Sequence, residues 1–171
     1  ETIAIRVTGR FGGAAEAKDL ALAYVRDLGM DGANYRALEF VGDGAAGIPM
    51  EGRLTCSNMA VEAGAKAGLF YADRESVEYL AGFGLRASPQ VKEDCTYVRE
   101  LEFDLADLVP LIAVGHRVDR VKEAAKLVGT TVDQVFVGTC TNGRLGDLER
   151  LARILKGKKV KVRTIVVPAS R

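Results

Sequence analysis

Runs of alternating apolar and polar residues recur along the chain, and they predict half-buried β-strands. The clearest alternation covers residues 2–7 and 96–103. Shorter apolar runs predict further strands at residues 36–41, 69–71 and 160–167. Strands are therefore expected along the whole chain and not in one half of it.

Apolar residues spaced one turn apart lie between these runs and predict amphipathic helices. The predicted helices cover residues 17–28, 50–67, 74–82, 118–128 and 145–155. In the second of them, Leu54, Val61 and Ala65 are expected to form the buried stripe. Asp73 is a good N-cap for the third, because its side chain can accept a hydrogen bond from the first turn.

The order of these elements predicts an α/β fold. A strand–helix–strand unit brings the chain back in the same direction, so the sheet is expected to be parallel. Ligands of such sheets bind at the carboxyl ends of the strands. The loop-like stretch at residues 82–94 is a candidate boundary. We therefore expect one α/β domain over residues 1–95 and a partial second one over residues 96–171.

Composition indicates a folded globular protein, with 48% hydrophobic and 27% charged residues in a chain of 171. The formal net charge of +1 gives no electrostatic basis for binding nucleic acid or a membrane surface. No apolar run approaches the roughly 18 residues that a membrane span needs. The three cysteines are far apart and odd in number, which favours a reducing cytoplasm over a disulfide framework.

The strongest candidate for chemistry is Cys140, which follows an apolar strand and precedes the last predicted helix. A helix N-terminus favours the thiolate, the form that binds a metal or attacks an electrophile. A thiol enzyme would also need a base, and His116 is the single histidine of the sequence. A metal site would need further ligands, and Cys56 and Cys95 lack ligand-like spacing. From spacing alone, a nucleophile, a metal ligand and a small buried residue all remain open.

A second candidate is the pair Asn58 and Glu62. These residues are four apart in a predicted helix and are expected to project from one face. Such a pair is either a solvated polar surface or a hydrogen-bonding pair directed at a cleft. The two residues by themselves do not separate these interpretations.

Several short motifs occur in a characteristic order. Around the candidate cysteine, residues 138–144 read Gly-Thr-Cys-Thr-Asn-Gly-Arg and are followed by Asp147 and Leu148. Further motifs are residues 50–55, residues 58–65, Ala17-Lys18-Asp19, His116 with Val118 and Asp119, and residues 165–170. Together they resemble the aconitase superfamily, and most closely the large subunits of 3-isopropylmalate dehydratase and homoaconitase. The resemblance covers nearly the whole chain.

The resemblance implies a fold, a cofactor and a reaction. The fold would consist of aconitase-like three-layer α/β/α domains with mainly parallel sheets. Members of the family bind a 4Fe-4S cluster through three cysteines, of which Cys140 would be the first. Asn58 would lie beside the cluster and Glu62 near the substrate hydroxyl. The reaction is the dehydration and rehydration of a small hydroxy acid. The closest resemblance favours 2-isopropylmalate in leucine biosynthesis, with homoaconitase or aconitase activity as alternatives.

The family's two other cluster cysteines do not occur in this sequence, and neither does the swivelling domain, which a small partner subunit carries. We therefore expect a central fragment of a large subunit that is colourless and inactive by itself. An alternative of another class is a cluster-free aconitase-like module that binds a partner protein or RNA. The charge balance argues against RNA.

Overall fold

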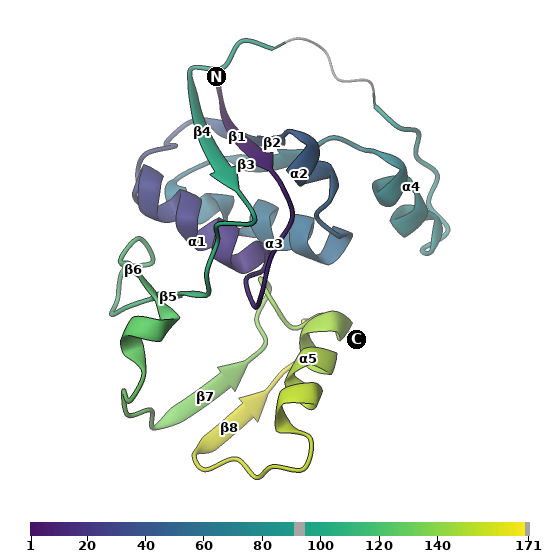
Figure 1. Cartoon of the computed structure of the whole chain (residues 1–171). Coiled ribbons are helices and arrows are strands. Elements are labelled where there is room, and N and C mark those ends of the chain that lie inside the picture. Colours follow the sequence, from purple (N-terminus) through teal and green to yellow (C-terminus); the bar gives the residue numbers. More distant parts are fainter. Residues whose placement is uncertain (91–94, 170–171) are drawn as a thin grey trace. The chain divides into compact units, whose positions relative to one another are not determined.

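The computed structural model describes residues 1–90 and 95–169, and the chain divides into two compact units (Figure 1). The first unit is Glu1–Lys126 and the second is Leu127–Arg171. This division lies after the predicted boundary between residues 95 and 96. The reason is that strand β4 (Arg99–Asp104) pairs with strand β1 (Thr2–Thr8) and so joins the sheet of the first unit. The last part of the predicted loop, residues 91–94, is outside the described residues.

A parallel sheet forms the centre of the first unit. Strand β1 pairs in parallel with β2 (Ala37–Val41) and with β4, and β2 pairs in parallel with β3 (Ala67–Phe70). The strand order is therefore β3-β2-β1-β4. Ile5 of β1 lies opposite Phe40 of β2 and Leu101 of β4. The predicted α/β fold with a parallel sheet is confirmed.

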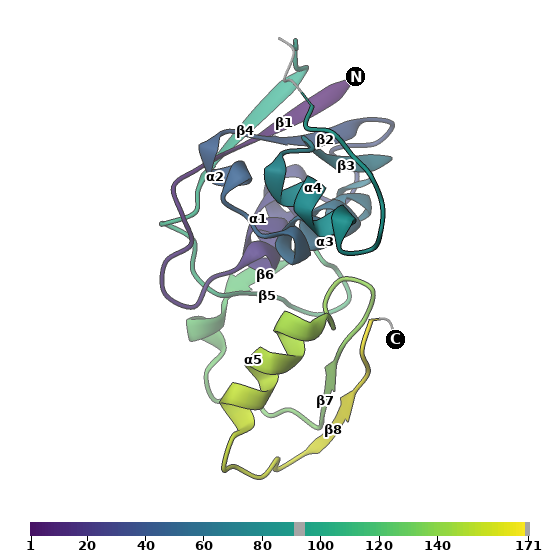
Figure 2. The same ribbon diagram turned by 90° about the vertical axis from the view of Figure 1, so that its right-hand side faces the viewer.

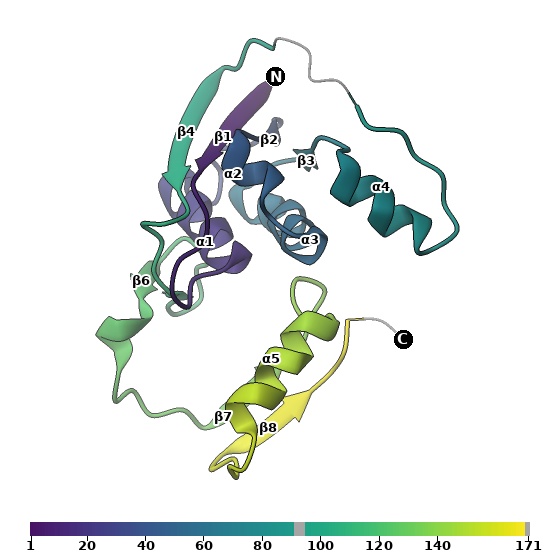
Figure 3. The same cartoon turned by 45° about the vertical axis from the view of Figure 1, so that its right-hand side comes forward.

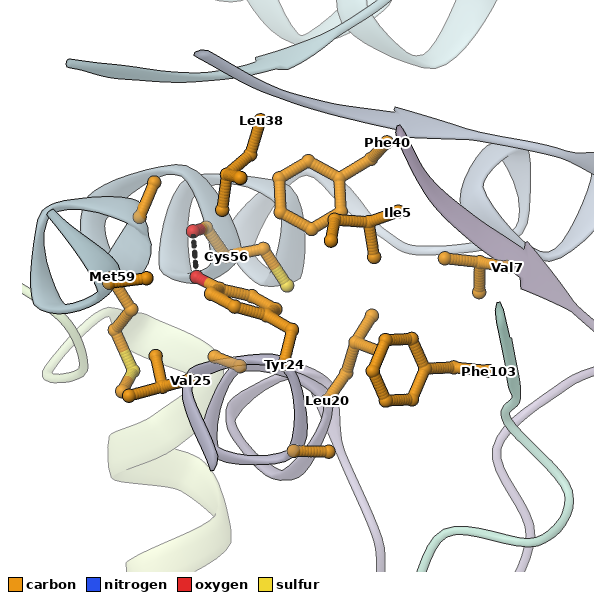
Figure 4. Packing of buried hydrophobic residues seen from close by; sticks show 14 of the residues in the cluster. Ile5, Val7, Leu20, Tyr24, Val25, Leu38, Phe40, Cys56, Met59 and Phe103 are labelled. Atoms are coloured by element: carbon orange, nitrogen blue, oxygen red, sulfur yellow. Dashed lines mark hydrogen bonds between the residues drawn. The ribbon is translucent and has the colours of Figure 1, made fainter. Parts of the chain in front are cut away.

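Helices α1 (Ala17–Leu28) and α3 (Met50–Met59) cover one face of this sheet (Figures 1 and 2). The bounds of α1 agree with the predicted helix at residues 17–28. Tyr24 of α1 is fully buried and packs edge-on against Phe40, with 5.7 Å between the ring centroids (Figure 4). Burial of each large apolar side chain contributes roughly 1.5–3 kcal/mol. The layer between helices and sheet is thus the main source of this unit's stability.

Helix α3 ends earlier than predicted. It is followed by a short 3-10 helix, η1 (Ala60–Ala63), and then by Gly64 in the left-handed region, with φ 82°. The N–H of Ala65 donates to the carbonyl of Ala60 at 3.2 Å, and that of Gly64 to Val61 at 2.9 Å, which is the pattern of a glycine-terminated helix. Val61, expected in the buried stripe, is consequently 66% exposed.

Two further helices complete the strand connections of the first unit. Helix α2 (Asp43–Ala46) follows β2, and helix α4 (Arg74–Ala81) follows β3. Asp73 caps α4 as predicted, because its carboxylate accepts a hydrogen bond from the N–H of Ser76 at 3.1 Å. None of the helices within the described ranges has the length and apolar character that a membrane crossing requires.

The predicted helix at residues 118–128 is wrong. Strand β6 (Val121–Glu123) pairs antiparallel with strand β5 (Leu111–Ala113), and a 3-10 helix, η2 (Ala124–Leu127), follows. Pairing with a neighbouring strand overrides the helical spacing of the apolar residues, because strand preference depends strongly on such tertiary contacts.

The second unit contains a strand–helix–strand arrangement (Figure 3). Strand β7 (Gln134–Val137) leads into helix α5 (Leu145–Leu155), and strand β8 (Arg163–Val166) pairs in parallel with β7. Phe136 of β7 lies opposite Ile165 of β8. Both the parallel pairing and the bounds of α5 confirm the prediction.

Candidate functional site

Cys140 lies in a turn between β7 and α5, as predicted, and it is exposed. The guanidinium of Arg144 folds back over the turn. It donates to the carbonyl of Thr141 at 2.7 Å and to that of Cys140 at 3.4 Å. These hydrogen bonds stabilise the turn from within, and the thiol of Cys140 lies at the surface of its unit.

Asp147 closes the same turn from the side of the helix. Its carboxylate accepts hydrogen bonds from the N–H of Gly143 at 2.8 Å, the N–H of Arg144 at 3.1 Å and the side-chain amide of Asn142 at 3.0 Å. The sequence leads us to expect that N–H groups at this helix end face the thiolate, but these two bind Asp147. The negative charge of Asp147 also opposes the positive end of the helix dipole. Asp147 therefore engages the backbone donors at the start of the helix.

The backbone of the turn has unusual dihedral angles on both sides of the cysteine. Gly138 has φ 144°, and a Cβ there would collide with the carbonyl oxygen of Val167. Thr139 is β-branched and yet has φ 86°, a conformation that costs on the order of 1–3 kcal/mol. The N–H of Ala169 donates to the carbonyl of Gly143 at 3.0 Å and holds the turn from outside. Strain of this kind persists where the surrounding structure imposes it, which is typical of functional sites.

One acceptor beside the cysteine has no donor. Among the described residues, Oδ1 of Asn142 is buried and receives no hydrogen bond. A buried polar atom left in this state costs about 1–3 kcal/mol. A donor from outside the described residues would complete the turn at this point.

Of the three cysteines, Cys140 fits the role of a ligand to an iron–sulfur cluster. Cys56 is fully buried, burial raises the pKa of its thiol to about 12, and its Sγ donates to the carbonyl of Ala17 at 3.4 Å. Cys95 is exposed. Within residues 1–90 and 95–169, no group of three or more His, Cys, Asp or Glu side chains could hold a metal ion. Cys140 can therefore serve as one ligand if the others come from elsewhere in a complete protein.

Asn58 lies in the last turn of α3 and Glu62 lies in η1, and both are exposed. The prediction that they project from one face requires an uninterrupted α-helix. Residues four apart differ by about 40° around the axis of an α-helix, but by about 120° in a 3-10 helix. Only the part of this step from Ala60 onward has 3-10 geometry, so the angle between the two side chains is wider than in an uninterrupted α-helix and smaller than 120°. Both belong to the first unit, whereas Cys140 belongs to the second.

His116 is exposed in the connection between β5 and β6, in the first unit. Next to it, Arg117 donates to both carboxylate oxygens of Asp119, at 2.9 and 2.6 Å, and lowers the pKa of that carboxyl. A thiol enzyme that pairs His116 with Cys140 stays a hypothesis.

Arg53, in the motif that begins α3, fastens this helix to α4. Its side chain is 3% exposed and donates to both carboxylate oxygens of Asp73 at 2.7 Å. Its other N–H groups reach Oγ of Ser76 at 3.1 Å and the carbonyls of Ala46 and Ile48 at 2.9 and 2.8 Å. The hydrogen bonds from Arg53 lower the pKa of Asp73 to about 2. Because all its donors are engaged, Arg53 is a structural clamp and not an anion-binding residue.

Asp19 has a comparable role at the start of α1. One carboxylate oxygen accepts from the N–H of Glu16 at 2.7 Å, and the other accepts from the N–H of Leu111 at 2.7 Å. Burial raises the pKa of this carboxyl. The contact ties β5 to α1 and thereby fixes the connection that carries His116.

Sequence reasoning missed the organising roles of Tyr24, Arg53 and Asp147. Asp147 had a usable signal, because an acidic residue at the third helical position commonly pairs with the N-terminal backbone. Arg53 had none, since charged residues are expected at the surface. The apolar spacing of α1 predicts that Tyr24 is buried, but not which group its hydroxyl binds.

Comparison with known proteins extends the resemblance. A sequence model of the aconitase family (aconitate hydratase) matches residues 1–127 and 118–171. The chain is 49% identical over its whole length to 3-isopropylmalate dehydratase large subunit 2 of Archaeoglobus fulgidus and covers 42% of that protein. It is 46% identical to 3-isopropylmalate dehydratase large subunit 1 of Thermotoga maritima and covers 43% of it. A protein of Methanosarcina mazei, named as a probable methanogen homoaconitase large subunit, is 43% identical and is covered over 44% of its length.

The chain thus spans about two fifths of the length of the curated relatives that it matches. The family match extends over both compact units and includes Asn58, Glu62 and Cys140. The parallel sheet and its covering helices agree with the fold that the motifs imply. On these grounds the chain belongs to the aconitase family.

Proposed function

We propose that this chain is the central part of the large subunit of a 4Fe-4S hydro-lyase that interconverts 2-isopropylmalate and 3-isopropylmalate in leucine biosynthesis. The observation that carries the proposal is the 49% identity, over the entire chain, to a 3-isopropylmalate dehydratase large subunit. The exposure of Cys140, in a turn whose backbone is strained, supports it.

Three residues of the chain would take part in this reaction. Cys140 would hold the cluster through its thiolate. When bound, the cluster supplies an iron that acts as a Lewis acid toward the hydroxyl and carboxylate of the substrate. Glu62 would accept or return a proton at the substrate hydroxyl. Asn58 would donate from its side-chain amide to a cluster sulfur or a substrate oxygen. The exposure of Asn58 and Glu62 makes both accessible to a ligand.

The complete enzyme would require a second subunit. The relatives are named large subunits, which supports a small partner subunit that carries the swivelling domain. The small molecule that the two would convert is a hydroxy acid. With one of the three cluster thiolates, this stretch by itself would bind no cluster and would be inactive. The odd number and wide spacing of the three cysteines support a cytoplasmic location.

The substitution Glu62→Gln in the complete two-subunit enzyme tests the proposal. We expect unchanged iron content and a kcat for 2-isopropylmalate that is lower by roughly 100-fold or more, the range for a positioned acid or base. Glu78→Gln is the matched control, because Glu78 is an exposed carboxylate on α4 that pairs with Arg74. The control should leave both quantities unchanged. An unaltered kcat in Glu62→Gln would remove Glu62 from the reaction.

Homoaconitase activity is the second candidate, since a relative with that name is 43% identical over the same stretch. The ratio of kcat/KM for the substrates of the two enzymes decides between them. A complete protein that binds no iron and converts neither substrate would instead support the cluster-free interaction module.

A further inference from the structure

Tyr24 of α1 is joined to helix α3 by a polar contact in the core. Its side chain is fully buried, and its hydroxyl donates to the carbonyl of Cys56 at 2.7 Å (Figure 4). A buried tyrosine hydroxyl needs a hydrogen-bond partner, and here the partner is the backbone of α3. The ring is held in place by its edge-on contact with Phe40.

The carbonyl of Cys56 has a special position in α3. An uninterrupted α-helix would pair it with the N–H of Ala60. In the structure, Ala60 donates to the carbonyl of Ser57, which is the hydrogen bond of a 3-10 helix. The Tyr24 hydroxyl therefore donates to the carbonyl at the point where the helix changes type.

Strand β3 also packs closely against the end of α3. A Cβ at Gly68 of β3 would lie 2.8 Å from Cα of Ser57 and 3.0 Å from Cβ of Ala60. A glycine is needed at this close approach, because a larger residue would push the helix away. With β3 against it and Tyr24 bound to it, the segment has little freedom to shift.

The geometry of this segment decides where Glu62 projects. Asn58 precedes the change of helix type, and Glu62 follows it. Each residue in 3-10 geometry adds about 20° of rotation around the axis relative to an α-helix, and η1 begins at Ala60. The pKa of Tyr24 is raised well above its ordinary value, chiefly by burial and in part by the charges of Cys56 and Glu62, which agrees with a Glu62 carboxylate near the phenol.

We propose that Tyr24 is a positioning residue for Glu62. Its buried hydroxyl withholds the Cys56 carbonyl from α3, imposes 3-10 geometry on residues 60–63, and so sets the direction of the Glu62 carboxylate. The inference rests on the proposed function, in which Glu62 moves a proton.

The substitution Tyr24→Phe in the complete two-subunit enzyme tests this inference, since it removes the hydroxyl and keeps the ring. We expect the crystal structure of the variant to show the N–H of Ala60 bound to the carbonyl of residue 56, with the carboxylate of Glu62 turned around the helix axis. The kcat should fall about tenfold with iron content unchanged, because small misplacements of a catalytic group are costly. The limb of the kcat pH profile that Glu62→Gln abolishes should shift. Tyr35→Phe is the matched control, because the side chain of Tyr35 is 84% exposed.

A double-mutant cycle separates positioning from general destabilisation. If Tyr24 acts through Glu62, adding Tyr24→Phe to Glu62→Gln should lower kcat no further. Multiplying effects of the two substitutions would overturn the inference. So would a variant structure in which Ala60 still donates to Ser57 and Glu62 has not moved. Unchanged turnover of Glu62→Gln alone refutes the catalytic role of Glu62 in the proposed function. The role of Tyr24 is tested without measuring activity, because the structure of Tyr24→Phe shows which carbonyl accepts the hydrogen bond from the N–H of Ala60.

Discussion

At the scale of single residues, the three cysteines show how surroundings decide what one side chain can do. Cys56 is fully buried in the core, and burial raises the pKa of its thiol to about 12. Cys95 and Cys140 are exposed. Because the thiolate is the reactive form, only a thiol that can ionise and meet the reagent is modified readily.

Alkylation should therefore divide the cysteines of this chain into two classes. With iodoacetamide at neutral pH, we expect Cys95 and Cys140 to be modified and Cys56 to remain unmodified, as measured by mass spectrometry of the digested protein. In denaturant all three should react at similar rates, which is the control. Modification of Cys56 in the folded chain as fast as that of Cys140 would contradict the burial of Cys56.

The sequence predicted the location of Cys140 better than its surroundings. Strand and helix signals flank it, so its place in a turn follows from local pattern. Its exposure depends on how the turn is held by Arg144 and Asp147. The position of Asp147 in the first turn of the helix is a sequence signal for its contact, but the contact of Arg144 has none. The stripe predicted for α3 was right for Ala65, which is buried, and wrong for Val61, which is exposed.

At the scale of elements, the ion pair between Arg53 and Asp73 joins α3 to α4. Arg53 is nearly inaccessible, whereas the side chain of Asp73 is 36% exposed. Asp73 also caps α4 through the N–H of Ser76. The folded carboxyl has a pKa of about 2, chiefly because Arg53 donates to it. An unfolded aspartate has a pKa of about 3.9, so the unfolded state binds more protons between these values.

This difference gives stability a defined pH dependence. The contribution of Asp73 should be complete above about pH 5 and should be lost as the pH falls from about 4 towards 2. Asp73→Asn should lower the free energy of unfolding by about 1–2 kcal/mol at pH 7, a value discounted for the exposure of Asp73. It should also flatten the acid limb, measured by urea unfolding at several pH values. Asp27→Asn, which breaks the exposed pair with Arg26, should change stability by less than about 0.5 kcal/mol. An equal decrease in the free energy of unfolding in both variants would contradict the stabilising role of the Arg53–Asp73 pair.

Elements defined by local signals were predicted well, and those defined by tertiary contacts were not. The bounds of α1 and α5 follow from apolar spacing and from capping residues close in sequence. The early end of α3 involves the hydroxyl of Tyr24, which is 32 residues away from Cys56. The strand pair that replaces the predicted helix at residues 118–128 likewise depends on a partner strand.

At the scale of the whole chain, the family could be predicted from the sequence, whereas the division into two compact units depends on a long-range contact. The family follows from short motifs, each of which is local. The division between the units depends on β4, which leaves the preceding loop to pair with β1 far back in the sequence. Loop composition alone therefore does not predict where the two compact units divide.

The two units should also differ in stability, because their burial differs. The buried hydrophobic residues of the described chain lie in the first unit, between Ile3 and Leu105. In the second unit, α5 has no buried residue within the described part, and Phe136 and Leu145 are exposed. A unit of this size with so little buried apolar surface is marginal by itself. Packing against other parts of a complete protein would supply the missing burial.

Hydrogen exchange on residues 1–171 tests this difference. We expect the amides of β7, β8 and α5 to exchange at least about tenfold faster than those of β1 and β2, because segments with few buried contacts open at lower free energy. The same amides should become protected in the complete large subunit, where further residues can cover them. The protection of β1 and β2 should change little between the two proteins, which provides an internal control. Equal protection of both units in residues 1–171 would show that the second unit folds stably without additional burial.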